Sequence, residues 1–184
     1  ELCDILESNP VGLTARAAKR KVKLCLDSRE AGPGVVFWPL KGARFDAHSF
    51  IPEVMKKGAL MSVMDAGRAE ESLADVYVPV DDSNQALLKL ARGYQRLFKV
   101  KKVAVTGSNG KTTTKEMLKA VLSTQFKTMA TEGNLNNQIG VPRTLFHLKH
   151  SDEVAVVEMG TNAPGEIHPL SMAVEPDIAV ITNV

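Results

Sequence analysis

The sequence predicts an α/β protein: a small N-terminal mixed α/β module followed by a P-loop-type parallel sheet with helices on both faces, incomplete at the C-terminus. Three observations predict this class. Before residue 80, short apolar runs alternate with turns rich in Gly, Pro, Asp and Ser. After residue 100, apolar strands alternate regularly with helical patterns, and a glycine-rich turn separates the first strand from the first helix. We therefore expect two domains, residues 1–80 and residues 81–184.

The first domain is expected to contain four short strands and one helix. The strands are predicted at residues 22–26, 35–40, 60–64 and 76–80. A helix is predicted near residues 49–58, because Ile51, Val54 and Met55 share one side and Gly58 can end it. A longer amphipathic helix is expected to follow. Within residues 81–98, apolar side chains recur at spacings of three and four, and Asp81 or Asp82 can cap the N-terminus.

The second domain is expected to alternate strands and helices. Its strands are predicted at residues 102–107, 127–131, 153–159 and 177–183. Its helices are predicted at residues 111–124 and 142–148, with a short one beginning near Gly165. In the first of these helices, Met117, Leu118 and Val121 are predicted to face inward. This alternation is typical of a parallel sheet covered on both faces, whose ligands bind at the carboxyl ends of the strands.

Composition excludes several classes of protein. The net charge of +2 over 184 residues, without a dense stripe of basic and aromatic residues, predicts no nucleic-acid partner; the basic segment at residues 16–23 is interpreted as a solvated helix face. Cys3 and Cys25 cannot form a disulfide framework.

No apolar run predicts a membrane span or a signal peptide, so we expect a cytoplasmic protein. We also expect a monomer. Because the chain starts at Glu1 and stops within an apolar run at Val184, we expect its ends to be cut.

The glycine-rich turn has the features of a phosphate-binding loop. Residues Gly107, Ser108, Asn109 and Gly110 lie between a strand and a helix that starts with Lys111, Thr112 and Thr113. Backbone amides and the positive end of the helix would face ATP phosphates, Lys111 would reach the β and γ phosphates, and Thr112 would bind Mg²⁺. The common motif has a Gly where this chain has Val105, so the loop is a shorter version. The alternative is a plain strand-to-helix turn.

Two further features lie beside this loop in the predicted sheet. Glu158 ends a strand, where a carboxylate can hold Mg²⁺, although a strand-end Glu is more often simply solvated. The stretch EGNLNNQIGVP, residues 132–142, is rich in amides that can orient a substrate or serve only as loop residues. In the first domain, Ser28, Arg29, Lys41, Asp46 and His48 lie on predicted turns, where binding groups concentrate. Neither a zinc site nor a nucleophile elbow is indicated.

Taken together, these stretches resemble the Mur ligases, ATP-dependent amide-forming enzymes of peptidoglycan precursor synthesis, and hence of cell wall biogenesis, cell shape and cell division. The resemblance covers TGSNGKTTTKEM, GNLNNQIGVPRTL, VVEMGTNAPGEI and DSREAGPGVVFWPLKGARFDAHSF, from about Asp27 to the end of the chain. Within the family, these stretches look like the member that adds D-alanyl-D-alanine to UDP-N-acetylmuramoyl-tripeptide. The alternatives are the diaminopimelate- or lysine-adding member and a nucleotide-binding module without catalysis.

The resemblance also implies roles for single residues. Lys111 would bind the ATP phosphates, Thr112 and Glu158 would hold Mg²⁺, and Asn134 and Asn137 would line the junction between ATP and the acyl substrate. The UDP-sugar pocket would be formed by Ser28, Arg29, Lys41, Gly42, Phe45, Asp46 and His48. The reaction would activate the peptide carboxylate as an acyl phosphate, which the amine of D-alanyl-D-alanine then attacks.

The chain departs from the family pattern in two respects. Ala47 and Ser49 stand where the family pattern has Gly and Asp, so the turn would be strained if Ala47 needed a positive φ. The family's metal-binding His, its modified Lys and its third domain do not lie within residues 1–184. We therefore expect these 184 residues alone not to turn over.

Overall fold

The computed structural model describes residues 2–14, 21–42, 45–71 and 73–184, and it divides into two compact units, Glu1–Ala86 and Leu87–Val184. Most of the basic segment at residues 16–23 lies outside the described residues. Both units contain parallel sheets flanked by helices, so the predicted α/β class is confirmed. No helix in the described part of the chain has the length and apolar character that crossing a membrane requires.

Unit 1 is built on a four-stranded sheet with the order β1-β2-β5-β6, in which all neighbouring strands run parallel. Its strands are β1 (Lys23–Cys25), β2 (Val35–Phe37), β5 (Met61–Asp65) and β6 (Tyr77–Val80). All four predicted strands are therefore confirmed. β2 ends earlier than predicted, because Pro39 follows Trp38 and cannot donate to a ladder. Trp38 is fully buried, and its Nε1 donates to the Ser83 carbonyl at 2.8 Å.

The helix of unit 1 is α2 (Ile51–Lys56), which begins two residues after the start of the predicted segment. Its Ile51 and Val54 are buried against the sheet, as the spacing predicts. Several short elements were not predicted, because two- to six-residue segments carry too little periodicity to recognise. They are α1 (Leu2–Leu6), the hairpin of β3 (Lys41–Gly42) and β4 (Phe45–Asp46), and the 3-10 helices η1 (Ser28–Glu30), η2 (Ala47–Phe50) and η3 (Ala66–Glu71).

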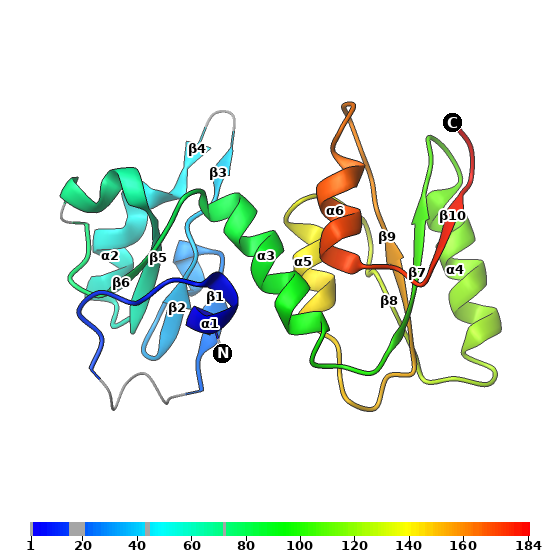
Figure 1. Ribbon diagram of the computed structural model, residues 1–184, viewed down its shortest axis with the longest axis horizontal. Helices are drawn as coiled ribbons and strands as arrows, with labels where there is room; N and C mark the ends of the chain where they lie inside the picture. The colour runs from blue at the N-terminus through cyan, green and yellow to red at the C-terminus, as the bar shows by residue number, and fades with distance from the viewer. Residues whose placement is uncertain (1, 15–20, 43–44, 72) are drawn as a thin grey trace. The chain divides into compact units, whose positions relative to one another are not determined.

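Unit 2 contains a second four-stranded parallel sheet, with the order β10-β7-β9-β8. Its strands are β7 (Lys101–Thr106), β8 (Thr128–Ala130), β9 (Val154–Glu158) and β10 (Ile178–Ile181). Its helices are α3 (Ser83–Gln95), which begins in unit 1, α4 (Lys111–Leu122), α5 (Gly140–Leu145) and α6 (Ile167–Val174). Within unit 2, α4 lies on one face of the sheet, and α5 and α6 lie on the other (Figure 1). The predicted sheet covered on both faces is confirmed.

α3 starts as the sequence predicts. The Asp82 side chain accepts a hydrogen bond from the Gln85 amide at 2.8 Å, so Asp82 caps the helix. The apolar stripe predicted for this helix is confirmed in part: Ala86, Leu87, Leu90 and Ala91 are buried, whereas Leu97 is 48% exposed. Leu88, which the predicted stripe did not include, is buried in the core of unit 2.

The inward face of α4 was predicted wrongly in part. Met117 and Val121 are 64% and 68% exposed, whereas Leu118 packs against the sheet together with Leu122. At about 100° per residue, Met117 lies about 160° and Val121 about 120° around the helix from Lys115, away from the buried side. Lys115, one turn before Leu118 and two turns before Leu122, takes the buried position and is 1% exposed. The prediction used only the apolar residues of the helix, and these do not indicate that a lysine occupies its buried side.

Glu175 joins α3 to the end of α6 within unit 2. Its carboxylate accepts hydrogen bonds from Arg92 and Gln95, both at 2.8 Å, and from Arg96. Its backbone is left-handed, with φ of 49°, and its amide caps α6 by donating to the Ser171 carbonyl. The hydrogen bond from Arg96 is the main cause that lowers the pKa of Glu175 from 4.5 to about 2.

We expect the stability of unit 2 to depend on this carboxylate. Because the pKa is lower in the folded state, the stabilisation is present above about pH 4.5 and is lost as the pH falls toward 2. Glu175→Gln should lower the free energy of unfolding at pH 7 by about 1 kcal/mol, since the arginines are partly exposed. The substitution should also reduce the loss of unfolding free energy as the pH falls from 4.5 to 2. Urea denaturation at pH 7 and pH 3 measures both effects.

The matched control is Glu53→Gln, which removes an exposed ion pair between Glu53 of α2 and Lys57 just after the helix. This control should change neither the stability of unit 2 nor its pH dependence. If Glu175→Gln lost as much stability between pH 4.5 and 2 as the unsubstituted chain does, the stabilising role of Glu175 would be contradicted.

Candidate functional site

The glycine loop, residues 107–110, connects β7 to α4 at the carboxyl end of the sheet. Gly107 and Gly110 have φ values of 132° and 77°, which side chains with a Cβ rarely adopt. No side chain caps α4 at Gly110, so the first-turn amides of the helix are not satisfied by a cap. With the helix dipole, these amides form a favourable position for an anion. A capping Ser or Asn, as in the plain-turn alternative, is not observed.

Lys111 folds over this loop. Its Nζ donates to the carbonyl oxygens of Gly107 at 2.6 Å and Ser108 at 3.1 Å. The ammonium group therefore lies directly above the loop, where it can reach an anion held by the helix N-terminus. Lys111 also lines a cavity in unit 2, described below.

Thr182 and Asn183, which sequence reasoning did not select, hold the glycine loop from the neighbouring strand. The Ser108 amide donates to the Asn183 carbonyl at 3.1 Å, and the Asn109 amide donates to Asn183 Oδ1 at 2.8 Å. Thr182 Oγ1 donates to the Asn109 carbonyl at 2.5 Å. The amides of Ser108 and Asn109 are thus already engaged, which leaves the amides from Gly110 onward as the better candidates for binding a phosphate.

Glu158 lies next to the glycine loop, because β9 pairs with β7 in a register that places Glu158 opposite Val105. Its Oε1 accepts hydrogen bonds from Asn136 Nδ2 at 2.8 Å and from Thr112 Oγ1 at 3.2 Å. Its Oε2 is buried and has no hydrogen-bond partner among the described residues. The side chain is 2% exposed, so Glu158 is not a solvated strand end.

The amide-rich stretch, residues 132–142, contains both a turn residue, Asn137, and an amide side chain that contacts the candidate site, Asn136. Asn137 acts as a turn residue, since its Oδ1 accepts from the amides of Ile139 at 3.1 Å and Gly140 at 2.8 Å. Asn136, which was not predicted, binds Glu158 and also accepts from the Gly160 amide through its carbonyl at 2.8 Å. Asn134 is exposed. A Cβ on Gly160 would lie 2.9 Å from the Asn136 side chain, which explains the glycine there.

A cavity of about 160 Å³ opens beside Lys111 and the end of β9. It brings together residues from the glycine loop, the amide-rich stretch and the segment after β9: Lys111, Asn136, Asn137, Gln138, Gly160, Thr161, Asn162, Glu166 and Leu170. Glu166 organises that last segment by accepting from the amides of Asn162 at 2.7 Å and Ala163 at 3.2 Å. The Asn162 amide is the main cause that lowers the pKa of Glu166. Thr161, Asn162 and Gln138 were missed, although two of them follow Glu158 by only a few residues.

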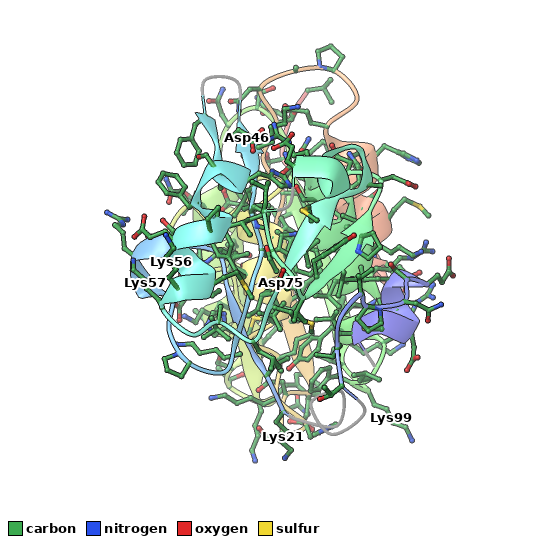
Figure 2. The ribbon with its side chains drawn as sticks, turned by 90° about the vertical axis from the view of Figure 1, so that its left-hand side faces the viewer. Lys21, Asp46, Lys56, Lys57, Asp75 and Lys99 are labelled. Atoms are coloured by element: carbon green, nitrogen blue, oxygen red, sulfur yellow. The ribbon has the colours of Figure 1, made fainter. Side chains whose placement is uncertain are left out.

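The predicted substrate residues of unit 1 fall into two groups. Ser28 and Arg29 form η1, where Arg29 pairs with Asp27 and, mainly through its side-chain hydrogen bond, lowers the pKa of Asp27 to about 2. The β3–β4 hairpin contains the other predicted residues of this group, Lys41, Gly42, Phe45 and Asp46, and Figure 2 labels Asp46 at its base. Phe45 is 57% exposed. These groups expose an arginine, a lysine and an aromatic ring.

His48 lies beneath the hairpin and is fully buried. The Asp65 amide donates to its Nε2 at 3.3 Å, so Nδ1 carries the proton and donates to Asp46 Oδ1 at 2.7 Å. Burial opposes the shift, but hydrogen bonds from His48 lower the pKa of Asp46 overall. His48 therefore orients Asp46 through this hydrogen bond, and its own ring is not accessible to a ligand. Ala47 lies in η2 without a positive φ, so the strain considered for this turn does not arise.

Comparison with known proteins places these features in a family. Residues 105–184 match the family described as Mur ligase middle domain. The chain is 43% identical to the UDP-N-acetylmuramoyl-tripeptide–D-alanyl-D-alanine ligase of Bacillus subtilis, over 86% of this chain and 35% of that relative. The chain thus spans about a third of the length of this curated relative.

Solved structures agree with this similarity. MurF from Acinetobacter baumannii superposes with a TM-score of 0.84 at 35% identity, covering 98% of this chain and 39% of that chain. The MurF ligase from Thermotoga maritima in complex with ADP superposes with a TM-score of 0.76 at 35% identity, covering 94% and 39%. With the middle-domain match and relatives that align over most of its residues, this chain belongs to the Mur ligase family.

Proposed function

We propose that this chain supplies the ATP-binding and UDP-substrate-binding parts of an ATP-dependent ligase that adds D-alanyl-D-alanine to UDP-N-acetylmuramoyl-tripeptide. The observation that carries the proposal is the geometry around Glu158. A buried carboxylate oxygen without a partner lies beside the Thr112 hydroxyl, at the start of a helix whose N-terminus no side chain caps. The similarity to named ligases supports the choice of reaction.

The donor set near Glu158 fits Mg²⁺. Mg²⁺ prefers oxygen ligands and is commonly held by one or two carboxylates, waters and substrate phosphates. Glu158 Oε2 and the Thr112 hydroxyl are such oxygens, and no cluster of three or more His, Cys, Asp or Glu occurs in the described ranges to compete for the ion. When bound, Mg²⁺ would neutralise charge on the ATP phosphates. Asn136 and Thr112 would keep Glu158 aimed at this position through Oε1.

The remaining residues would bind and orient the substrates. Lys111 would exchange its bonds to loop carbonyls for bonds to the β and γ phosphates, placing positive charge where it builds up during phosphoryl transfer. Asn134 and Asn137 would lie toward the acyl substrate, and the cavity beside Lys111 would admit its carboxylate end. This carboxylate would take the γ-phosphoryl group of ATP to become an acyl phosphate, with ADP as the leaving group. The amine of D-alanyl-D-alanine would then attack the acyl carbon, displace phosphate and lose a proton to give the amide.

In unit 1, we propose that the UDP-sugar binds to the groups that this unit exposes. Arg29 and Lys41 would contact the diphosphate, and Ser28 and Gly42 would supply polar backbone beside it. Phe45 would stack on a ring. His48 would contribute by orienting Asp46. A cytoplasmic, monomeric protein remains our expectation.

A chimera tests the reaction. Residues 1–184 would replace the corresponding segment of the Bacillus subtilis ligase, and phosphate release would be measured with UDP-N-acetylmuramoyl-tripeptide and D-alanyl-D-alanine. We expect turnover with these substrates and none with UDP-N-acetylmuramoyl-dipeptide plus diaminopimelate or lysine. A chimera carrying Lys111→Ala serves as the inactive control. Turnover with only the dipeptide and diaminopimelate or lysine would favour the other member of the family.

A further inference from the structure

Lys115 is a buried charge to which no step above assigns a role. It is the only buried residue of α4, a helix described along its whole length, and it is 1% exposed. Lys111, one turn earlier, covers the glycine loop, so the two lysines share one side of the helix. Moving an ammonium group out of water is costly unless partners compensate, so its partners indicate why it is there.

Two of the three partners of Lys115 lead to Glu158, and the third is Glu116. Its Nζ donates to the Thr131 carbonyl at 2.9 Å, and it lies 2.9 Å from Glu116 Oε1 and 4.0 Å from Glu158 Oε2. Glu116 is the nearest carboxylate to Nζ and offsets part of the cost of burying the ammonium group, but its side chain is 56% exposed, whereas that of Glu158 is 2% exposed. Thr131 is connected to Glu158 as well, since its Oγ1 accepts from the Glu158 amide at 3.0 Å. Lys115 thus lies close to the Glu158 carboxylate and also donates a hydrogen bond to Thr131, the residue that accepts from the Glu158 backbone amide.

The distances leave Oε2 free for another ligand. At 4.0 Å, Lys115 contributes positive charge to Glu158 without a hydrogen bond to Oε2. The two donors to Oε1 fix the other side of the carboxylate. We propose that Lys115 is a positioning residue that holds Glu158 with Oε2 directed at Mg²⁺, an inference that rests on the proposed ATP site. Residues behind a metal ligand commonly change metal affinity by about 10- to 100-fold when replaced.

The experiment measures ATP affinity of the 184-residue chain by calorimetry, over a series of free Mg²⁺ concentrations and in EDTA. Lys115→Met removes the charge and keeps much of the volume. We expect the Mg²⁺ concentration for half-maximal ATP binding to rise by about tenfold or more, while ATP affinity in EDTA is unchanged. Lys115→Arg should restore part of the Mg²⁺ dependence. The matched control is Lys119→Met, which changes an exposed lysine one turn farther along α4 and should have no effect.

A purely structural role predicts another pattern. If Lys115 only ties α4 to Thr131, Lys115→Met should weaken ATP binding equally with and without Mg²⁺, and that result would overturn the proposal. A double-mutant cycle with Glu158→Gln gives a second readout, since Lys115→Met should shift the Mg²⁺ dependence no further once Glu158 is neutral. If Lys115→Met fails to fold, Lys115→Arg is carried through the same cycle, and additivity there would also overturn it.

Failure of the proposed ATP site is distinguishable from failure of this inference. If the unsubstituted chain bound no ATP at any Mg²⁺ concentration, the nucleotide site itself would be contradicted. If it bound ATP with a Mg²⁺ dependence that Lys115→Met left unchanged, only the role of Lys115 would be contradicted.

Discussion

Lys111→Ala is expected to lower the affinity of the chain for ATP by about a hundredfold. A charge-assisted hydrogen bond contributes roughly 1.5–3 kcal/mol, and 1.4 kcal/mol is a factor of ten in affinity. Lys111 must give up its bonds to the Gly107 and Ser108 carbonyls to reach phosphate, which offsets part of the gain. Calorimetric titration with ATP and Mg²⁺ measures the loss.

Lys119→Ala is the control for this prediction. It removes an exposed lysine from the same helix and the same amount of net charge, so it tests for a general electrostatic effect. We expect nearly unchanged ATP affinity for this variant, and thermal melting should confirm that both variants fold. Retained ATP affinity in Lys111→Ala would contradict the assignment of residues 107–113 as the phosphate-binding loop.

Glu158→Gln is expected to remove the Mg²⁺ dependence of ATP binding. Glutamine has the size of glutamate and can keep a carbonyl oxygen toward Asn136 and Thr112, but its amide nitrogen would then take the place of Oε2. A nitrogen with two hydrogens cannot bind a cation, and it would face Lys115. ATP affinity in Mg²⁺ should therefore fall to the value in EDTA. In the chimera, phosphate release should fall about 10²- to 10³-fold, as when a group that stabilises transition-state charge is removed.

The control is Glu153→Gln, just before the opposite end of the same strand. Glu153 is exposed, and its Oε2 accepts from the Lys127 amide, far along the strand from the glycine loop. This substitution should leave the Mg²⁺ dependence and the chimera's turnover unchanged. A Glu158→Gln chain that still required Mg²⁺ for tight ATP binding would rule out Glu158 as a metal ligand.

Elements with strong local signals were predictable. The strand, glycine loop and helix at residues 101–122 combine β-branched residues, glycines at positive φ and a helix start, all within about twenty residues. Asp82 as a helix cap is equally local. The hairpin of β3 and β4 was missed, because its two-residue strands are defined by pairing with each other and not by periodicity.

The site was predictable only where residues act through local sequence. Glu158 and Lys111 each lie where a strand ends or a helix begins, so their positions follow from the predicted elements. Asn136, Thr182 and Asn183 act across strands, and nothing in their own segments indicates the distant group that each one binds. Their contacts depend on the strand order β10-β7-β9-β8, which local patterns do not contain.

The sequence by itself therefore determined the α/β class, the glycine loop and the two charged groups beside it, because backbone conformation and strand ends follow from local residue types. Only the tertiary structure decided which oxygen of Glu158 is free, that His48 is buried beneath Asp46, and that Lys115 instead of Met117 faces the sheet. These outcomes depend on the burial of charged groups, and burial is set by segments that meet in space although they are far apart in the chain.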